Sequence, residues 1–201
     1  ETALRVYKHI LDNIENEQVI PAAKLGYAKT QEALFVNKYK TANPEWKTYY
    51  FTFAAEDKDI QPVIDAYKEI VKIYKQSEVA IEANLRIGIL YSYYSNKPEE
   101  GQTYFNIISN DYPMSKFASL ALIELGNISV RNAKLDEAEK YFQSVLSTPR
   151  VNAEDRNFAN YRLAKIYSYK NDFETARQKL STVMGNLKDN IANDAIQFSI
   201  L

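Results

Sequence analysis

Small residues recur in pairs along this chain, and the two members of each pair stand 12 or 13 positions apart. The first members follow one another at steps of 34, 38 and 38 positions. A constant period of about 20–50 residues is the signature of a repeat architecture. The pairs are Ala54 with Ala66, Gly88 with Gly101, Gly126 with Ala138, and Ala164 with Ala176.

Each pair predicts one hairpin of two antiparallel helices. Packed helix axes lie about 8–10 Å apart, and small residues at the crossing allow the near end of that range. We therefore expect Gly126 to lie against Ala138. Large apolar residues flank the small ones and fill the grooves between the helices: Phe53, Ile87, Leu125 and Leu163 before the first members, and Ile70, Phe105, Phe142 and Leu180 after the second. One hairpin cannot bury its whole apolar face, so successive hairpins should stack.

Apolar periodicity, capping residues and proline divide the chain into helices joined by short connections. Five Gly and six Pro in 201 residues suit an all-α chain. Each Pro stands at an expected boundary, where its missing N–H does least harm. The segment 45–56 is aromatic and reads as a strand on propensity alone, but its neighbours favour a helix. The expected helices are 1–17, 21–39, 45–56, 62–74, 78–94, 98–111, 116–130, 136–148, 153–169, 173–184 and 190–201.

The repeat residues resemble the tetratricopeptide repeat family. The resemblance rests on the small and large residues above, with Tyr91 and Tyr167 three positions after Gly88 and Ala164, and it covers about residues 47–184. The chain departs from the family pattern in its longer spacing of 38, in Ser129 where Tyr is usual, and in Gly101 where Ala is usual. The segment 111–115, DYPMS, resembles a junction found in bacterial envelope repeat lipoproteins.

The resemblance implies an all-α fold, an α-α superhelix in the form of a right-handed solenoid of antiparallel hairpins. We expect residues 1–45 to form a degenerate repeat or an N-terminal helical cap. Residues 46–201 should hold about four repeats, the last one truncated. The chain begins without Met and stops inside an expected helix, so we expect it to be cut from a longer protein. The junction favours the bacterial periplasm or an outer-membrane-associated location, with the cytoplasm as the alternative.

The resemblance also implies a concave face, lined by the first helix of each hairpin, that holds an extended peptide or a partner helix. Four of its residues, Asn127, Arg131, Arg162 and Lys165, could together receive acidic groups, because Arg offers a planar fork of donors. The alternative is that these are ordinary solvated helix faces. The expected partner-binding residues are Leu85, Arg86, Ile89, Ser92, Tyr93, Ile123, Asn127, Arg131, Tyr161, Arg162, Lys165 and Tyr169.

Sixteen Tyr residues are a second feature that bears on binding. Exposed Tyr provides a large contact area at low entropic cost. The alternative is that most of them belong to the core, as the packing positions of Tyr91, Tyr141 and Tyr167 indicate. Tyr93, Tyr161 and Tyr169 are the ones expected to be exposed.

Composition excludes several function classes. A net charge of −1 without a basic cluster argues against a nucleic-acid partner. The absence of Cys excludes disulfides, thiol catalysis and Cys-based zinc sites. No apolar run approaches the roughly 20 residues of a membrane span. His9 is the single His and has no second ligand type near it in sequence, and the five Gly form no phosphate loop.

We therefore predict no catalytic, cofactor-binding or metal-binding residue. The first hypothesis is a non-enzymatic protein-interaction scaffold. The second is a structural or oligomerisation spacer of a larger multidomain envelope or signalling protein, in which a homo-oligomer fills the groove. An enzymatic or sugar-binding α-solenoid is the third.

Overall fold

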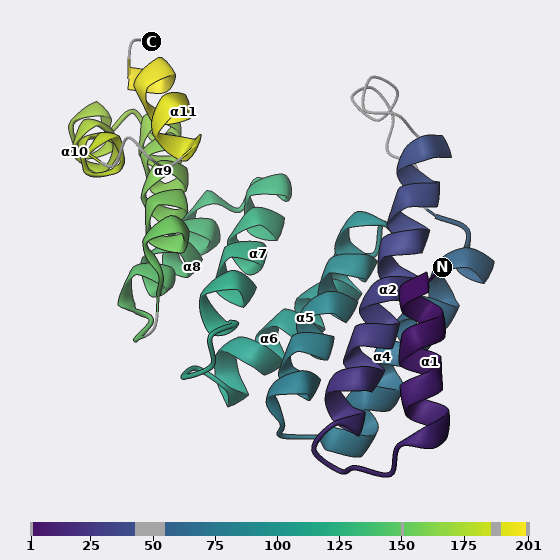
Figure 1. The fold of residues 1–201 in the computed structure, drawn as a ribbon. Helices are drawn as coiled ribbons and strands as arrows, with labels where there is room; N and C mark the ends of the chain where they lie inside the picture. The colour runs from purple at the N-terminus through teal and green to yellow at the C-terminus, as the bar shows by residue number, and fades with distance from the viewer. Residues whose placement is uncertain (1, 43–54, 150, 186–189, 200–201) are drawn as a thin grey trace. The chain divides into compact units, whose positions relative to one another are not determined.

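The computed structural model describes residues 2–42, 55–149, 151–185 and 190–199, and every regular element in these ranges is an α-helix (Figure 1). This confirms the all-α helical-repeat class, while the right-handed superhelix stays a prediction. The expected helix over 45–56 falls mostly outside the described residues. The helices are α1 (Thr2–Asn13), α2 (Ile20–Ala42), α4 (Asp57–Tyr74), α5 (Glu78–Tyr93), α6 (Pro98–Asp111), α7 (Ala118–Arg131), α8 (Leu135–Ser147), α9 (Ala153–Tyr169), α10 (Phe173–Met184) and α11 (Asn190–Ser199).

Local capping signals set several of the helix starts where the sequence predicts them. The Ser77 hydroxyl accepts a hydrogen bond from the Ala80 amide (3.3 Å) and begins α5. Asn152 accepts from the Asp155 amide (2.7 Å) at α9, and the Asp172 carboxylate begins α10 in the same way. Each cap satisfies an amide that has no partner within its helix.

Four predicted boundaries are wrong by two or more residues. Helix α2 runs to Ala42 and not to position 39. Helix α4 begins at Asp57, and Pro62 lies inside it, because Ile60 already belongs to the buried face that the helix must present. Helix α7 begins at Ala118 and not at position 116, because the Ser115 hydroxyl accepts from the Phe117 amide in a turn that precedes the helix. Helix α1 ends at Asn13, four residues before its expected end.

The chain divides into two compact units, 1–107 and 108–201, with the division inside α6. The predicted border at residue 45 stays a prediction. In the first unit α2 packs against α4, and α4 packs against α5. The core of this unit is formed by α2, α4 and α5, and Tyr67 and Ile87 are fully buried in it.

The second unit repeats one pattern of contacts. Helix α7 packs against α8, and α9 packs against α10, while α8 also contacts α9 (Figure 1). Helix α11 lies beside both α9 and α10. The core residues Phe142 and Leu163 are fully buried, as is Leu125. The hairpins of this unit therefore share their apolar faces in chain order.

The small residues make room for aromatic rings. A methyl group added to Gly88 would lie 2.5 Å from Cε1 of Phe105, and one added to Gly126 would lie 2.7 Å from Cζ of Phe142. The three atoms nearest to that methyl group all belong to the ring of Phe142. The expected contact of Gly126 with Ala138 stays a prediction. The missing side chain of Gly126 lets α7 and α8 approach closely, because the ring of Phe142 occupies the volume that it leaves.

Gly101 serves a different purpose, and this explains its departure from the family pattern. A methyl group there would lie 2.0 Å from Oγ of Ser92 and 2.7 Å from the carbonyl oxygen of Gly88. The α6 backbone therefore approaches the α5 backbone too closely for any side chain at this position.

Candidate partner-binding face

Three of the predicted partner-binding residues lie in the cores. Leu85, Ser92 and Ile123 are 5%, 4% and 6% exposed. Their side chains pack between helices and offer no surface to a partner. Counting positions from the small residue does not separate the inner edge of a helix from its solvent-facing edge.

In the first unit Arg86 is turned towards α2. Its Nη1 lies 3.5 Å from Oε1 of Glu32, and its Nη2 lies 3.9 Å from Oε1 of Glu82. Ile89 is half-buried, and Tyr93 is exposed. The guanidinium of Arg86 is therefore committed to carboxylates of its own unit.

Sequence reasoning missed the carboxylate that organises this region. Glu32 is buried, and the Tyr67 hydroxyl donates a hydrogen bond to its Oε2. Burial, together with the negative charge of Glu32, raises the pKa of Tyr67 well above its usual value. The available signal was helical spacing, because Glu32 stands between Ala28 and Phe35 on the buried side of α2.

In the second unit Arg162 joins α9 to α7 through a contact that the sequence did not predict. Its Nη2 donates to Oδ1 of Asn127 at 2.7 Å. Its guanidinium carbon lies 5.8 Å from the Phe142 ring centroid and 5.6 Å from that of Phe158, within the range of cation–π attraction. These contacts hold the planar group in one orientation.

Lys165 stands one turn further along α9. Its ammonium lies 5.5 Å from the Tyr161 ring and 5.9 Å from the Phe198 ring of α11. The two rings meet edge to face at 6.4 Å, and burial raises the pKa of Tyr161. Tyr169 is 62% exposed at the end of the helix. We call the surface predicted from Asn127, Arg131, Tyr161, Arg162, Lys165 and Tyr169 the α9 face.

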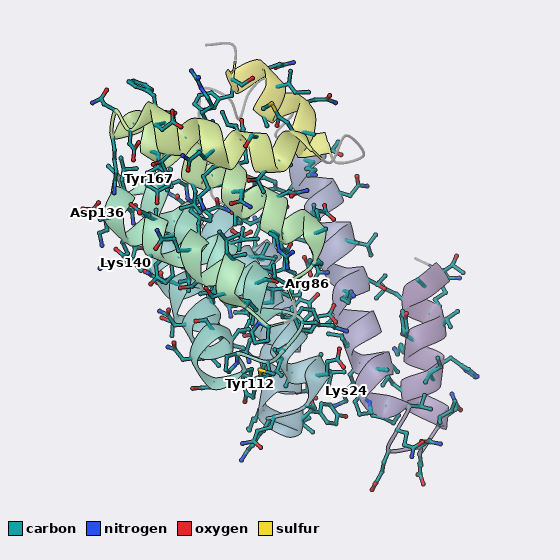
Figure 2. All side chains as sticks on the ribbon, turned by 90° about the vertical axis from the view of Figure 1, so that its left-hand side faces the viewer. Lys24, Arg86, Tyr112, Asp136, Lys140 and Tyr167 are labelled. Atoms are coloured by element: carbon teal, nitrogen blue, oxygen red, sulfur yellow. The ribbon has the colours of Figure 1, made fainter. Side chains whose placement is uncertain are left out.

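A second charged cluster joins α8 to α9 and was not predicted. The Lys170 ammonium lies 2.5 Å from Oδ1 of Asp136 and 2.6 Å from Oε2 of Glu139. The Tyr167 hydroxyl donates to Oε1 of Glu139 at 2.8 Å, and Figure 2 shows Tyr167 near Asp136. Their pairing with Lys170 crosses a hairpin and has no local signal in the sequence.

The pKa values in this cluster follow from its contacts. The hydrogen bond from Lys170 lowers the pKa of Asp136. Burial by itself would raise the pKa of Glu139, but the donors Lys170 and Tyr167 outweigh it and the net pKa is lowered. The same bonds raise the pKa of Lys170.

Within the described residues no group of His, Cys, Asp and Glu side chains is arranged to hold a metal ion. None of the helices in that part of the chain is both long and apolar enough to cross a membrane.

Comparison with known proteins identifies the fold. A family model described as a tetratricopeptide repeat-like domain matches residues 72–194, which is more than half of the chain. The crystal structure of BtubC (BKLC) from P. vanneervenii is similar at a TM-score of 0.55 and 12% sequence identity, over 90% of this chain and 85% of that one. At that identity the likeness concerns the fold alone. No curated protein sequence matches this chain.

Proposed function

Because the chain belongs to the family of tetratricopeptide repeat-like domains, we propose that it is a non-enzymatic scaffold that binds a peptide or partner helix on the α9 face. The observation that carries the proposal is the fixed guanidinium of Arg162. Asn127 and two aromatic rings hold it, and Lys165 stands beside it. An oriented fork of donors loses little entropy when it binds a carboxylate.

The charge of the α9 face indicates the chemistry of its partner. The predicted face carries three cations, Arg131, Arg162 and Lys165, and the carboxylate of Asp194 acts on Tyr161 beside them. Lys165 lies against aromatic rings, which attract a cation and leave its charge available to a bound anion. We therefore propose an acidic segment, with exposed Tyr169 giving an apolar contact at its end.

Binding of a synthetic acidic peptide tests this proposal. A ten-residue peptide of Asp, Glu and Leu, and a counterpart with Lys in place of the acids, are titrated against the intact chain by fluorescence anisotropy. The Lys165→Glu variant should weaken binding of the acidic peptide about tenfold. The matched control is Arg156→Glu, which reverses an exposed cation on another side of α9. Equal affinity for the two peptides would overturn the acidic-partner proposal.

Size-exclusion chromatography with light scattering distinguishes the proposed scaffold from the alternative role as an oligomerisation spacer. A stable dimer that Lys165→Glu dissociates would show that a second copy occupies the α9 face. The envelope location rests on the segment 111–115 alone and stays a proposal, which fractionation of cells expressing the full-length protein tests.

A further inference from the structure

Three apolar side chains of the second unit stand 38 positions apart, at the repeat spacing of this part of the chain. Leu120 of α7 is 38% exposed, Ile196 of α11 is 36% exposed, and Phe158 of α9 is half-buried. Helix α9 contacts both α7 and α11, so the three positions follow one another across neighbouring helices. We call Leu120, Phe158 and Ile196 the apolar row.

Two polar contacts fix the level of α7 against α9. Near the helix starts, the Ser119 hydroxyl donates to Oδ2 of Asp155 at 2.5 Å. About two turns further on, Nη2 of Arg162 donates to Oδ1 of Asn127 at 2.7 Å. Each helix places its residue of the apolar row between these two contacts. The two apolar side chains therefore lie at nearly the same level along α7 and α9.

The apolar row borders the α9 face. Leu120 and Asn127 stand seven residues apart in α7, and residues at this spacing share one side of a helix. On α9 the guanidinium carbon of Arg162 lies 5.6 Å from the ring centroid of Phe158. Asn127 and Arg162 both belong to the α9 face, so a partner bound there also meets the apolar row.

The distance between neighbouring helices indicates the conformation of such a partner. The axes of packed helices lie about 8–10 Å apart. A polyproline II segment rises about 3.1 Å per residue and has three residues per turn, so every third side chain returns to the same side after about 9 Å. An extended segment that crosses the helices can therefore place one apolar side chain against each member of the apolar row.

The charges beside the row indicate where the partner carries its acidic residues. Arg162 and Lys165 follow Phe158 by about one and two turns of α9. On α7 the residue equivalent to Arg162, 38 positions earlier, is Glu124. Acidic side chains of a bound segment are therefore attracted over α9 and repelled over α7.

We propose that the partner is an extended segment with an apolar residue at every third position, which crosses α7, α9 and α11 along the apolar row. Its acidic residues follow the apolar residue that lies against Phe158. This inference rests on the proposed function, because it describes the partner of the same surface. The acidic residues provide specificity, and burial of the exposed apolar area of Leu120 and Ile196 adds affinity.

Three nine-residue peptides test this inference on the intact chain by fluorescence anisotropy. The first, Leu-Pro-Ser-Leu-Glu-Glu-Leu-Pro-Ser, has the three-residue period. The second has the same composition with its three Leu in consecutive positions. The third replaces both Pro of the first by Ala, which allows a helix to form. The first should bind about fivefold more tightly than the second and no more weakly than the third.

A substitution in the apolar row tests the contact directly. Leu120→Ser should weaken binding of the first peptide about fivefold and change that of the second less than about twofold. Phe173→Ser is the matched control and should change neither, because it removes an exposed apolar side chain of α10 that lies outside the row. Circular dichroism establishes that each variant remains folded before it is titrated.

The Lys165→Glu variant distinguishes failure of this inference from failure of the proposed function. If the first two peptides bind equally and Lys165→Glu weakens both, the extended-partner inference is wrong and the acidic-partner function stands. If Lys165→Glu changes neither peptide, both are wrong. Tightest binding of the third peptide would assign the surface to a partner helix and would overturn the inference.

Discussion

The ring of Phe142 in α8 fills the space that the missing side chain of Gly126 leaves on α7. A methyl group on Gly126 would lie 2.7 Å from Cζ and 2.8 Å from Cε1 of the ring, and Phe142 is fully buried. In the next hairpin the corresponding residues are Ala164 and Leu180, which belong to one buried cluster. The two pairs divide the space between their helices differently. Gly126 goes with the large ring of Phe142, and the larger Ala164 goes with the smaller side chain of Leu180.

Replacing the Gly126–Phe142 pair stepwise by Ala and Leu gives the first prediction. Gly126→Ala should lower the free energy of unfolding by about 1–2 kcal/mol, because the overpacking cost exceeds the gain in helix propensity. In the Phe142→Leu background the same change should cost about 1 kcal/mol less, since Leu leaves room for the methyl group. Urea unfolding of the four proteins of the cycle measures the coupling. Additive effects would show that the ring does not set the space at Gly126.

The success of sequence reasoning depended on how local each signal is. Caps at Ser77, Asn152 and Asp172 and the periodic small residues act within a few turns, so helix order and hairpin pairing could be predicted. The repeat spacing places Asn127 and Arg162 on successive first helices, but their hydrogen bond to each other was not predicted.

The failures concern packing between distant segments. Glu32 and Tyr67 are 35 residues apart, and their hydrogen bond has no sequence signature beyond a polar residue on an apolar stripe. Burial of Leu85 and Ile123 depends on the rotation of their helices against neighbours, which the period alone does not determine. The sequence thus predicts which helices meet more reliably than it predicts which side chains face a partner.

The hairpin turns give a second prediction. Ala133 and Asn171 occupy equivalent positions, 38 residues apart, with φ of 57° and 62°. Asn96 lies one residue further along the turn of the preceding hairpin and has a φ of 53°. The left-handed region is costly for Ala, whereas Asn and Gly adopt it readily. Ala133→Gly should therefore raise the free energy of unfolding by about 0.5–1 kcal/mol. Asn171→Ala is the reciprocal variant and should lower it by a similar amount.

Thermal unfolding followed by circular dichroism measures both changes. The turn geometry is otherwise alike, because the Lys134 amide donates to the Ser129 carbonyl and the Asp172 amide donates to the Tyr167 carbonyl, both at 2.9 Å. A destabilised Ala133→Gly protein would mean that the freedom of Gly in the unfolded chain outweighs the relief of backbone strain.

The buried carboxylate of the first unit gives a third prediction. Tyr67→Phe removes the hydroxyl that donates to Glu32 and leaves that carboxylate buried with Arg86 3.5 Å away. The free energy of unfolding should fall by about 1–3 kcal/mol, the usual cost of an unsatisfied buried polar group. Adding Glu32→Leu should restore part of the loss, because both polar partners are then gone. Tyr169→Phe, at an exposed hydroxyl, is the control and should stay within about 0.5 kcal/mol.

The pH dependence of stability tests the cluster that joins α8 to α9. The pKa of Glu139 is lowered in the folded protein, because Lys170 and Tyr167 donate to its carboxylate. The folded protein therefore binds this proton less readily than the unfolded chain, whose Glu pKa is about 4.3. The stabilisation is fully present above that pKa and is lost as the pH falls through the lower, folded-state pKa.

Glu139→Gln should consequently lower the free energy of unfolding by about 0.5–1 kcal/mol at neutral pH and change it little in strong acid. Urea unfolding from about pH 7 down to the acid limit of the folded state measures the difference between the two proteins. Glu154→Gln, an exposed carboxylate at the start of α9, is the matched control and should stay within about 0.5 kcal/mol throughout. A loss at Glu139 that does not shrink in acid would mean that the side chain acts through packing, and that its ionisation contributes nothing.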